Sequence, residues 1–118
     1  MKACLALLLA SMCAVAVSPA TAGTQTGFIK SIYVRDSDGL ILVNLFMDET
    51  YFPNHPACGW QTYWVVPNET TASGKRLFAT LLAAQISGRH VTILGKNTCS
   101  RWGDGEDIDT VGVNGVVS

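Results

Sequence analysis

The fold class follows from residues 60–94, which read WQTYWVVPNETTASGKRLFATLLAAQISGRHVTIL. Residues 60–66 are rich in aromatic and β-branched side chains and predict a strand, which Pro67 ends. Residues 89–94 predict another strand. The residues between them have the apolar spacing of a helix, so the segment is interpreted as a strand–helix–strand unit.

The helix is expected to begin after one of three N-cap candidates, Thr70, Thr71 or Ser73, and to end at about Ser87. Gly88 then supplies the left-handed stop. One face carries the large apolar residues Leu77, Phe78, Leu81, Leu82 and Ile86. The opposite face carries Ala72, Arg76, Ala79, Thr80, Ala83 and Ser87. These small side chains would allow another chain to approach closely, although alanine is also simply a strong helix former.

The flanking sequence predicts further strands. Residues 27–34 and 40–47 predict two strands joined by a short turn of Asp and Gly. Residues 48–59 contain two prolines, an asparagine and a glycine and predict a loop. A second loop is expected at 95–106, followed by a last strand at 107–117 whose glycines indicate a bulge. The expected order is three strands, one helix and two strands.

Five short strands with one helix between the third and the fourth match the connectivity of the OB-fold, a small Greek-key barrel. In this interpretation the helix closes one end of the barrel. The alternative is an open α+β sheet with the helix across one face. The expected fold is therefore mainly β with one helix, in a single OB-fold-like domain over residues 23–118.

Residues 1–22 have the three-part layout of a secretory signal peptide. A positive charge precedes an apolar run at residues 3–17, and Ala20 and Ala22 are the small residues expected ahead of a cleavage site, which is placed just before Gly23. The apolar run is shorter than the ~20 residues of a membrane-spanning helix, and an N-terminal anchor helix is the alternative. The sequence thus predicts a secreted or periplasmic protein without a transmembrane segment.

Four cysteines occur, of which Cys4 and Cys13 are expected to leave with the signal peptide. Cys58 and Cys99 remain, and an even number of cysteines in an exported chain predicts a disulfide between them. The entropic model gives such a bridge roughly 3–4 kcal/mol of stabilisation. Two free thiols or an intermolecular bridge are the alternatives.

The composition excludes several classes of protein. The chain has 118 residues, of which 48% are hydrophobic and 14% charged, with a formal net charge of −1. This length suits one domain, and the apolar content excludes a disordered chain. The basic residues are few and scattered, so the basic groove that OB-folds use for single-stranded nucleic acid is not expected.

The sequence predicts no catalytic residues. The two histidines are His55, in a proline-flanked loop, and His90, which is expected to point to solvent from a strand. Neither has the pattern of a base beside a nucleophile, and the sequence contains no glycine-rich phosphate loop, HExxH or GxSxG. The chain is therefore interpreted as non-enzymatic, with no cofactor.

Four carboxylates cluster at Asp104, Glu106, Asp107 and Asp109. Alternating carboxylates can bind calcium, but the spacing of an EF-hand is absent. The favoured interpretation is a solvated acidic loop, and no metal site is predicted.

Aromatic residues give the clearest indication of a binding site. Trp60 and Trp64 alternate along the third predicted strand, and Trp64 is expected in the core. Loop aromatics and nearby polar groups would form a stacking platform that suits a sugar ring, whose C–H face packs on an aromatic and whose hydroxyls need acceptors. Alternatively, Trp102 covers the disulfide. The candidate ligand-binding residues are Asp48, Glu49, Tyr51, His55, Trp102 and Asp104.

Residues 58–102 resemble a family of small exported bacterial proteins that includes the B subunit of subtilase cytotoxin and the pertussis-like toxin B subunits. Residues 58–60 read Cys-Gly-Trp, one residue tighter than the family's Cys-x-x-Trp. Residues 81–88 match its helix motif Leu-Leu-Ala-Ala-x-x-Ser-Gly, and a Val-Thr-Ile strand at 91–93 and Cys99 complete the pattern. The resemblance covers under half of the chain, and its motifs are mostly structural.

The resemblance implies an OB-fold, a ring-shaped homo-pentamer whose helices line a central pore, and binding of cell-surface glycans. None of the family's glycan-contacting residues is carried over to this chain. Two hypotheses follow. The first is a secreted, toxin B-subunit-like module that recognises a glycan or a cell-surface receptor. The second is a stand-alone exported or periplasmic domain that binds another protein, such as an inhibitor or an envelope component.

Overall fold

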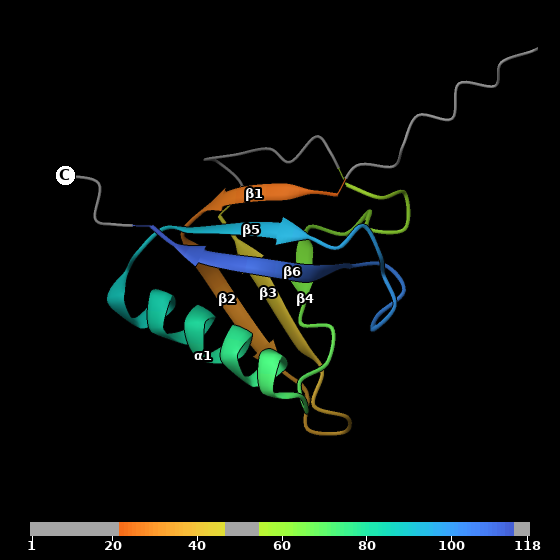
Figure 1. Cartoon of the computed structure of the whole chain (residues 1–118), viewed down its shortest axis with the longest axis horizontal. Helices are drawn as coiled ribbons and strands as arrows, with labels where there is room; N and C mark the ends of the chain where they lie inside the picture. The colour runs from red at the N-terminus through yellow and green to blue at the C-terminus, as the bar shows by residue number, and fades with distance from the viewer. Residues whose placement is uncertain (1–21, 47–54, 115–118) are drawn as a thin grey trace, which may run out of the picture.

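The computed structural model describes residues 22–46 and 55–114, which form one helix and an open sheet of six strands (Figure 1). The fold class is thus mainly β with one helix, as the sequence predicts. In chain order the elements are β1 (Thr24–Gly27), β2 (Ile29–Val34), β3 (Ile41–Leu45), β4 (Tyr63–Val65), α1 (Ala72–Ser87), β5 (Val91–Gly95) and β6 (Glu106–Val113).

The strands are ordered β1-β5-β6-β4-β3-β2 across the sheet. Neighbouring strands are antiparallel except β4 and β6, which run parallel with Trp64 opposite Glu106. β1 and β2 lie at opposite edges of this order, although Phe28 alone separates them along the chain. The two therefore act as one interrupted strand that pairs with β5 through its first part and with β3 through its second.

The sheet has six strands rather than the expected five, because β1 was not predicted. Its sequence, Thr-Gln-Thr-Gly, is polar and lacks the pattern of a half-buried strand. Gln25 is nevertheless only 1% exposed, and it accepts a hydrogen bond from Trp64 Nε1 at 2.8 Å. The burial of Trp64 confirms its predicted place in the core, whereas Trp60 is 65% exposed and lies outside β4.

The ends of α1 confirm the prediction. Thr71 is the N-cap, and its hydroxyl accepts a hydrogen bond from the backbone N–H of Gly74 at 3.1 Å. Gly88 ends the helix in the left-handed conformation, with φ 64°.

The predicted apolar face of α1 is partly wrong. Leu81 is buried and Leu77 and Phe78 pack against the core, but Leu82 is 38% and Ile86 79% exposed. The buried residues of α1 instead include two small ones, Gly74 and Ala84. A Cβ at Gly74 would lie 1.7 Å from the carbonyl oxygen of Asn68, so a glycine is needed there, and Ala84 belongs to the core. No helix in the described segments is long and apolar enough to cross a membrane.

Candidate functional site

Trp102 is the centre of the candidate site, in the loop that leads from β5 to β6. The residue is 36% exposed, and its Nε1 donates a hydrogen bond to the Tyr63 hydroxyl at 3.1 Å. The guanidinium of Arg35, the residue that follows β2, lies 4.6 Å from the centre of the Trp102 ring. Three segments that are distant in the sequence therefore fix the orientation of this indole.

Tyr63 links Trp102 to a carboxylate. Its hydroxyl donates a hydrogen bond to Asp104, and burial together with this contact raises the pKa of Tyr63 to about 12. The phenol therefore stays protonated at neutral pH. The ring of Tyr63 packs against Gly105, where a Cβ would lie 2.5 Å from Tyr63 Cε2, so a glycine is needed for this close approach. The result is a connected set of one indole, one phenol and one carboxylate.

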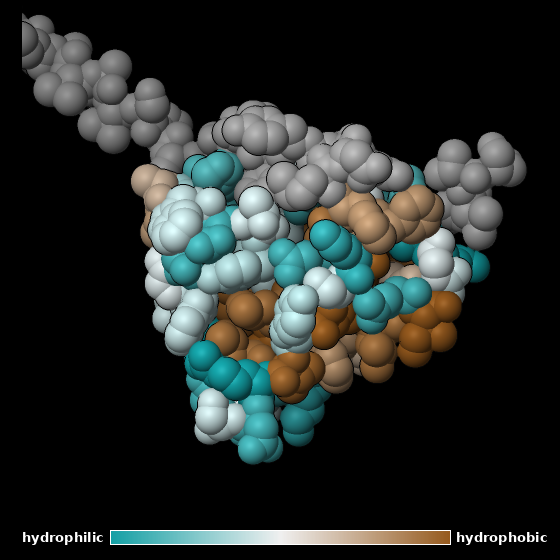
Figure 2. Space-filling model, turned by 180° about the vertical axis from the view of Figure 1, so that it is seen from behind, coloured by the Kyte–Doolittle hydropathy of each residue, from teal (hydrophilic) through white to brown (hydrophobic). Residues whose placement is uncertain are grey.

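Two surface hollows meet at Trp102. The first has a volume of about 370 Å³ and is mostly apolar, with Val34, Leu40 and Leu42 beside Arg35 and Trp102. The second has a volume of about 260 Å³ and is lined by Trp102, Gly103 and Asp104. In Figure 2, apolar residues gather in the middle of one face of the molecule and continue to its right-hand edge.

A network of charged side chains holds the rim of the first hollow. Arg35 donates from Nε to Asp38 at 2.9 Å, and this contact holds the pKa of Asp38 well below its ordinary value. Arg101 donates to both carboxylate oxygens of Glu69, at 3.0 and 3.2 Å, and to the carbonyl of Asp38. These contacts tie the β2–β3 turn to the loop that carries Trp102.

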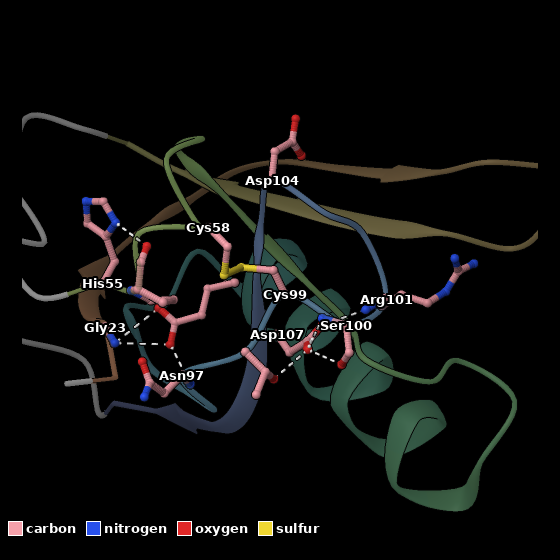
Figure 3. The surroundings of a disulfide bond; sticks show 12 residues. Gly23, His55, Cys58, Asn97, Cys99, Ser100, Arg101, Asp104 and Asp107 are labelled. Carbon is pink, nitrogen blue, oxygen red and sulfur yellow. Dashed lines mark hydrogen bonds between the residues drawn. A yellow bond between two sulfur atoms is a disulfide. The ribbon is translucent and has the colours of Figure 1, made fainter. Parts of the chain in front are cut away.

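The predicted disulfide between Cys58 and Cys99 is present and joins the segment before β4 to the loop that carries Trp102 (Figure 3). Beside it, Asp107 is fully buried and accepts hydrogen bonds from the hydroxyls of Thr98 and Ser100 at 2.7 and 2.6 Å. The backbone N–H groups of Ser100 and Arg101 also donate to it, at 2.9 and 3.4 Å. This carboxylate therefore fixes the chain on both sides of Cys99.

The expected solvated acidic loop is wrong for two of its four members. Asp107 is 0% and Glu106 2% exposed, because backbone and hydroxyl donors surround both carboxylates. Asp109 is exposed, as expected. Among the described residues, no group of three or more His, Cys, Asp and Glu side chains could hold a metal ion.

The structure brings together two of the predicted site residues, Trp102 and Asp104. His55 lies apart from Asp104, as Figure 3 shows. Its Nδ1 is 3.2 Å from the carbonyl oxygen of Pro56. The remaining predicted residues are outside the described residues, namely Asp48, Glu49 and Tyr51.

Sequence reasoning missed Tyr63 and Arg35 as members of the site. Tyr63 alternates with Trp64, which is buried, so its position on the other side of the strand was readable from the sequence. Arg35 stands in a turn sequence, Arg-Asp-Ser-Asp-Gly, which carries no signal for contact with Trp102. No family model, curated protein or solved structure matches this chain.

Proposed function

We propose that this chain is a secreted, non-enzymatic module that binds a glycan, like the toxin B subunits that it resembles. The observation that carries the proposal is the half-exposed indole of Trp102, held in place by Tyr63 beside the carboxylate of Asp104. An aromatic face next to hydrogen-bonding groups is the arrangement that a sugar ring requires.

The second hollow is the proposed sugar site. Arg35 stands over the Trp102 ring and lines the first hollow, whereas the second is lined by Trp102, Gly103 and Asp104. A Cβ at Gly103 would meet nothing within 4 Å, so the space in front of the backbone there is open. A volume of about 260 Å³ is below the range of drug-sized sites and suits one terminal sugar residue.

The test is binding of the exported protein to an array of glycans, followed by titration of the sugars that bind. Trp102→Ala should weaken binding about 30-fold, equivalent to about 2 kcal/mol, because truncation removes the stacking surface. Gly103→Leu should weaken it similarly by filling the second hollow while the indole remains. Protection of tryptophan fluorescence from iodide should accompany binding by the unmodified chain.

Trp60→Ala is the matched control, because Trp60 is also exposed but lies outside both hollows. It should bind the same glycans with unchanged affinity. Equal losses in the Trp60 and Trp102 variants, or binding unaffected by Gly103→Leu, would contradict a sugar site at Trp102.

We further infer an OB-fold-like closure of the sheet and assembly into a homo-pentamer. The closure is supported by β1 and β2, which are separated by Phe28 alone and pair with strands from the two ends of the strand order. The assembly is supported by Leu82 and Ile86, which leave apolar surface exposed on α1.

Light scattering on a sizing column tests the assembly. The oxidised, exported chain should have a mass near five times that of one chain, and Ile86→Glu should lower that mass because it places a charge in the helix–helix contact. If the unmodified protein is a monomer, the proposed pentamer is wrong. If in addition no glycan on the array binds, the second candidate function is favoured.

That second candidate is a stand-alone exported domain that binds another protein. It is supported by the first hollow, whose lining of Val34, Leu40 and Leu42 is more apolar than a sugar site and suits a side chain of a partner protein. Export itself is supported by the leader-like residues 1–22 and by the disulfide, a bond that persists in oxidising compartments.

A further inference from the structure

Glu106 is a buried carboxylate whose two oxygens both face the backbone nitrogen of Gly23. Glu106 is only 2% exposed, and each of its carboxylate oxygens lies 3.1 Å from Gly23 N. The N–H of Asn97 donates to Oε2 at 3.0 Å. Figure 3 draws the bonds at Gly23 as dashed lines, beside the disulfide.

The surroundings of this carboxylate are shaped to receive it. At Gly95 a Cβ would lie 1.8 Å from Glu106 Oε2, so any other residue there would occupy the carboxylate's place. Gly23 is itself buried and is held from its other side, because its carbonyl accepts a hydrogen bond from Gly95 N at 2.9 Å. Ala22, immediately before it, is exposed.

Gly23 is also the residue before which signal-peptide cleavage is expected. Hydrolysis of the Ala22–Gly23 peptide bond by a leader peptidase consumes one water, and leaves a carboxylate on Ala22 and a protonated amine on Gly23. An amide nitrogen has one hydrogen to share between two carboxylate oxygens, whereas an ammonium group has three. The cleaved chain would therefore match the two acceptors better than the uncleaved chain does.

We propose that processing before Gly23 creates an α-ammonium group that forms a buried ion pair with Glu106. This inference rests on the proposed export of the chain, but not on glycan binding. In the uncleaved chain, burial raises the pKa of Glu106, and the N–H groups of Asn97 and Gly23 only partly offset this effect. The cleaved chain supplies a full positive charge at the same place, so the ion pair would tie the residue before β1 to the first residue of β6.

The ion pair predicts a raised pKa for the α-amine. An α-amine ordinarily titrates at about 7.7–8.0, and the paired group should titrate at least about one unit higher. The other titratable groups that act on Glu106 are His55, which lowers the pKa of Glu106, and Asp107, which raises it. Because the folded pKa is raised, the stabilisation is complete below the unfolded pKa and is lost as pH rises through the folded one.

The experiment uses the full chain, exported by a bacterial host and purified after processing. Intact mass gives the mature N-terminus, and the Cα chemical shift of ¹³C-labelled Gly23 is followed between about pH 5 and pH 11 to cover both pKa values. The expected result is a chain that starts at Gly23 with an α-amine pKa raised by at least about one unit. Glu106→Gln should abolish that rise, and Asp109→Asn, on the exposed side of β6, should retain it.

The outcomes separate the two parts of the proposal. A mature chain that starts elsewhere overturns the inference through its processing step. A chain that starts at Gly23 but whose α-amine titrates at its ordinary pKa overturns the ion pair and leaves export standing. The titration of the unmodified chain decides this second point even if Glu106→Gln does not fold.

Discussion

A variant in which Cys58 and Cys99 are both replaced with alanine is expected to lose about 4 kcal/mol of its free energy of unfolding. The disulfide joins residues 41 positions apart and ties the loop before β4 to the loop after β5. Without it, the unfolded chain regains the conformational entropy of that loop. In a domain of this size, each kcal/mol lost from the free energy of unfolding lowers the melting temperature by about 4–8 °C, so the melting temperature should fall by about 20 °C.

Urea denaturation followed by circular dichroism measures this loss. The unmodified protein in excess reductant is the internal control, and it should unfold at the same urea concentration as the double variant. A loss below about 1 kcal/mol would show that the loop stays closed in the unfolded chain, contrary to the entropic account.

The second large effect is expected for Asp107→Ala. The substitution leaves the hydroxyls of Thr98 and Ser100 and two backbone N–H groups without their buried acceptor. Hydrogen bonds to a charged group contribute about 1.5–3 kcal/mol each, and the losses overlap, so the expected cost is about 4 kcal/mol. Asp109→Ala is the matched control two residues along β6. Asp109 is exposed, and its loss should change stability by less than about 0.5 kcal/mol.

The stability of the protein at low pH should depend on the same carboxylate, that of Asp107. Burial alone would raise the pKa of Asp107, but the donors from Ser100, Thr98 and Arg101 outweigh burial and lower it. With a lowered folded pKa, the stabilisation is complete above the unfolded value of about 3.9 and is lost as pH falls through the folded pKa. Thermal melts at falling pH should show this loss in the unmodified chain and a flatter profile for Asp107→Asn. A profile equally steep in both would assign the acid sensitivity to other groups.

Local signals in the sequence predicted the parts of the fold that depend on neighbouring residues. The cap at Thr71 and the stop at Gly88 are set by side chains and backbone within a few positions, and both were readable. The disulfide followed from the number of cysteines. The predicted apolar face of α1 was only partly right, because the small residues Gly74 and Ala84 are buried while Ile86 is exposed.

Features that depend on residues far away in the sequence could not be predicted from the sequence. Gln25 is a buried strand residue only because Trp64 donates to it, and Glu106 is buried only because distant backbone amides surround it. The candidate site shows the same limit. Trp102 and Asp104 stand out in the loop sequence, but the phenol of Tyr63 that joins them comes from another strand.

The parallel pairing of β4 with β6 has a consequence for the order in which the chain assembles. The β2–β3 pair closes over a short turn, whereas Trp64 can meet Glu106 only after α1 and β5 have been enclosed between them. Long-range pairing of this kind slows folding, because loop entropy is lost before contacts form. The disulfide encloses nearly the same residues, from 58 to 99. In an unfolded chain whose disulfide is already formed, residues 58 and 99 are held together, so less loop entropy is lost when β4 pairs with β6. The redox state of the compartment should therefore affect the folding rate as well as the final stability.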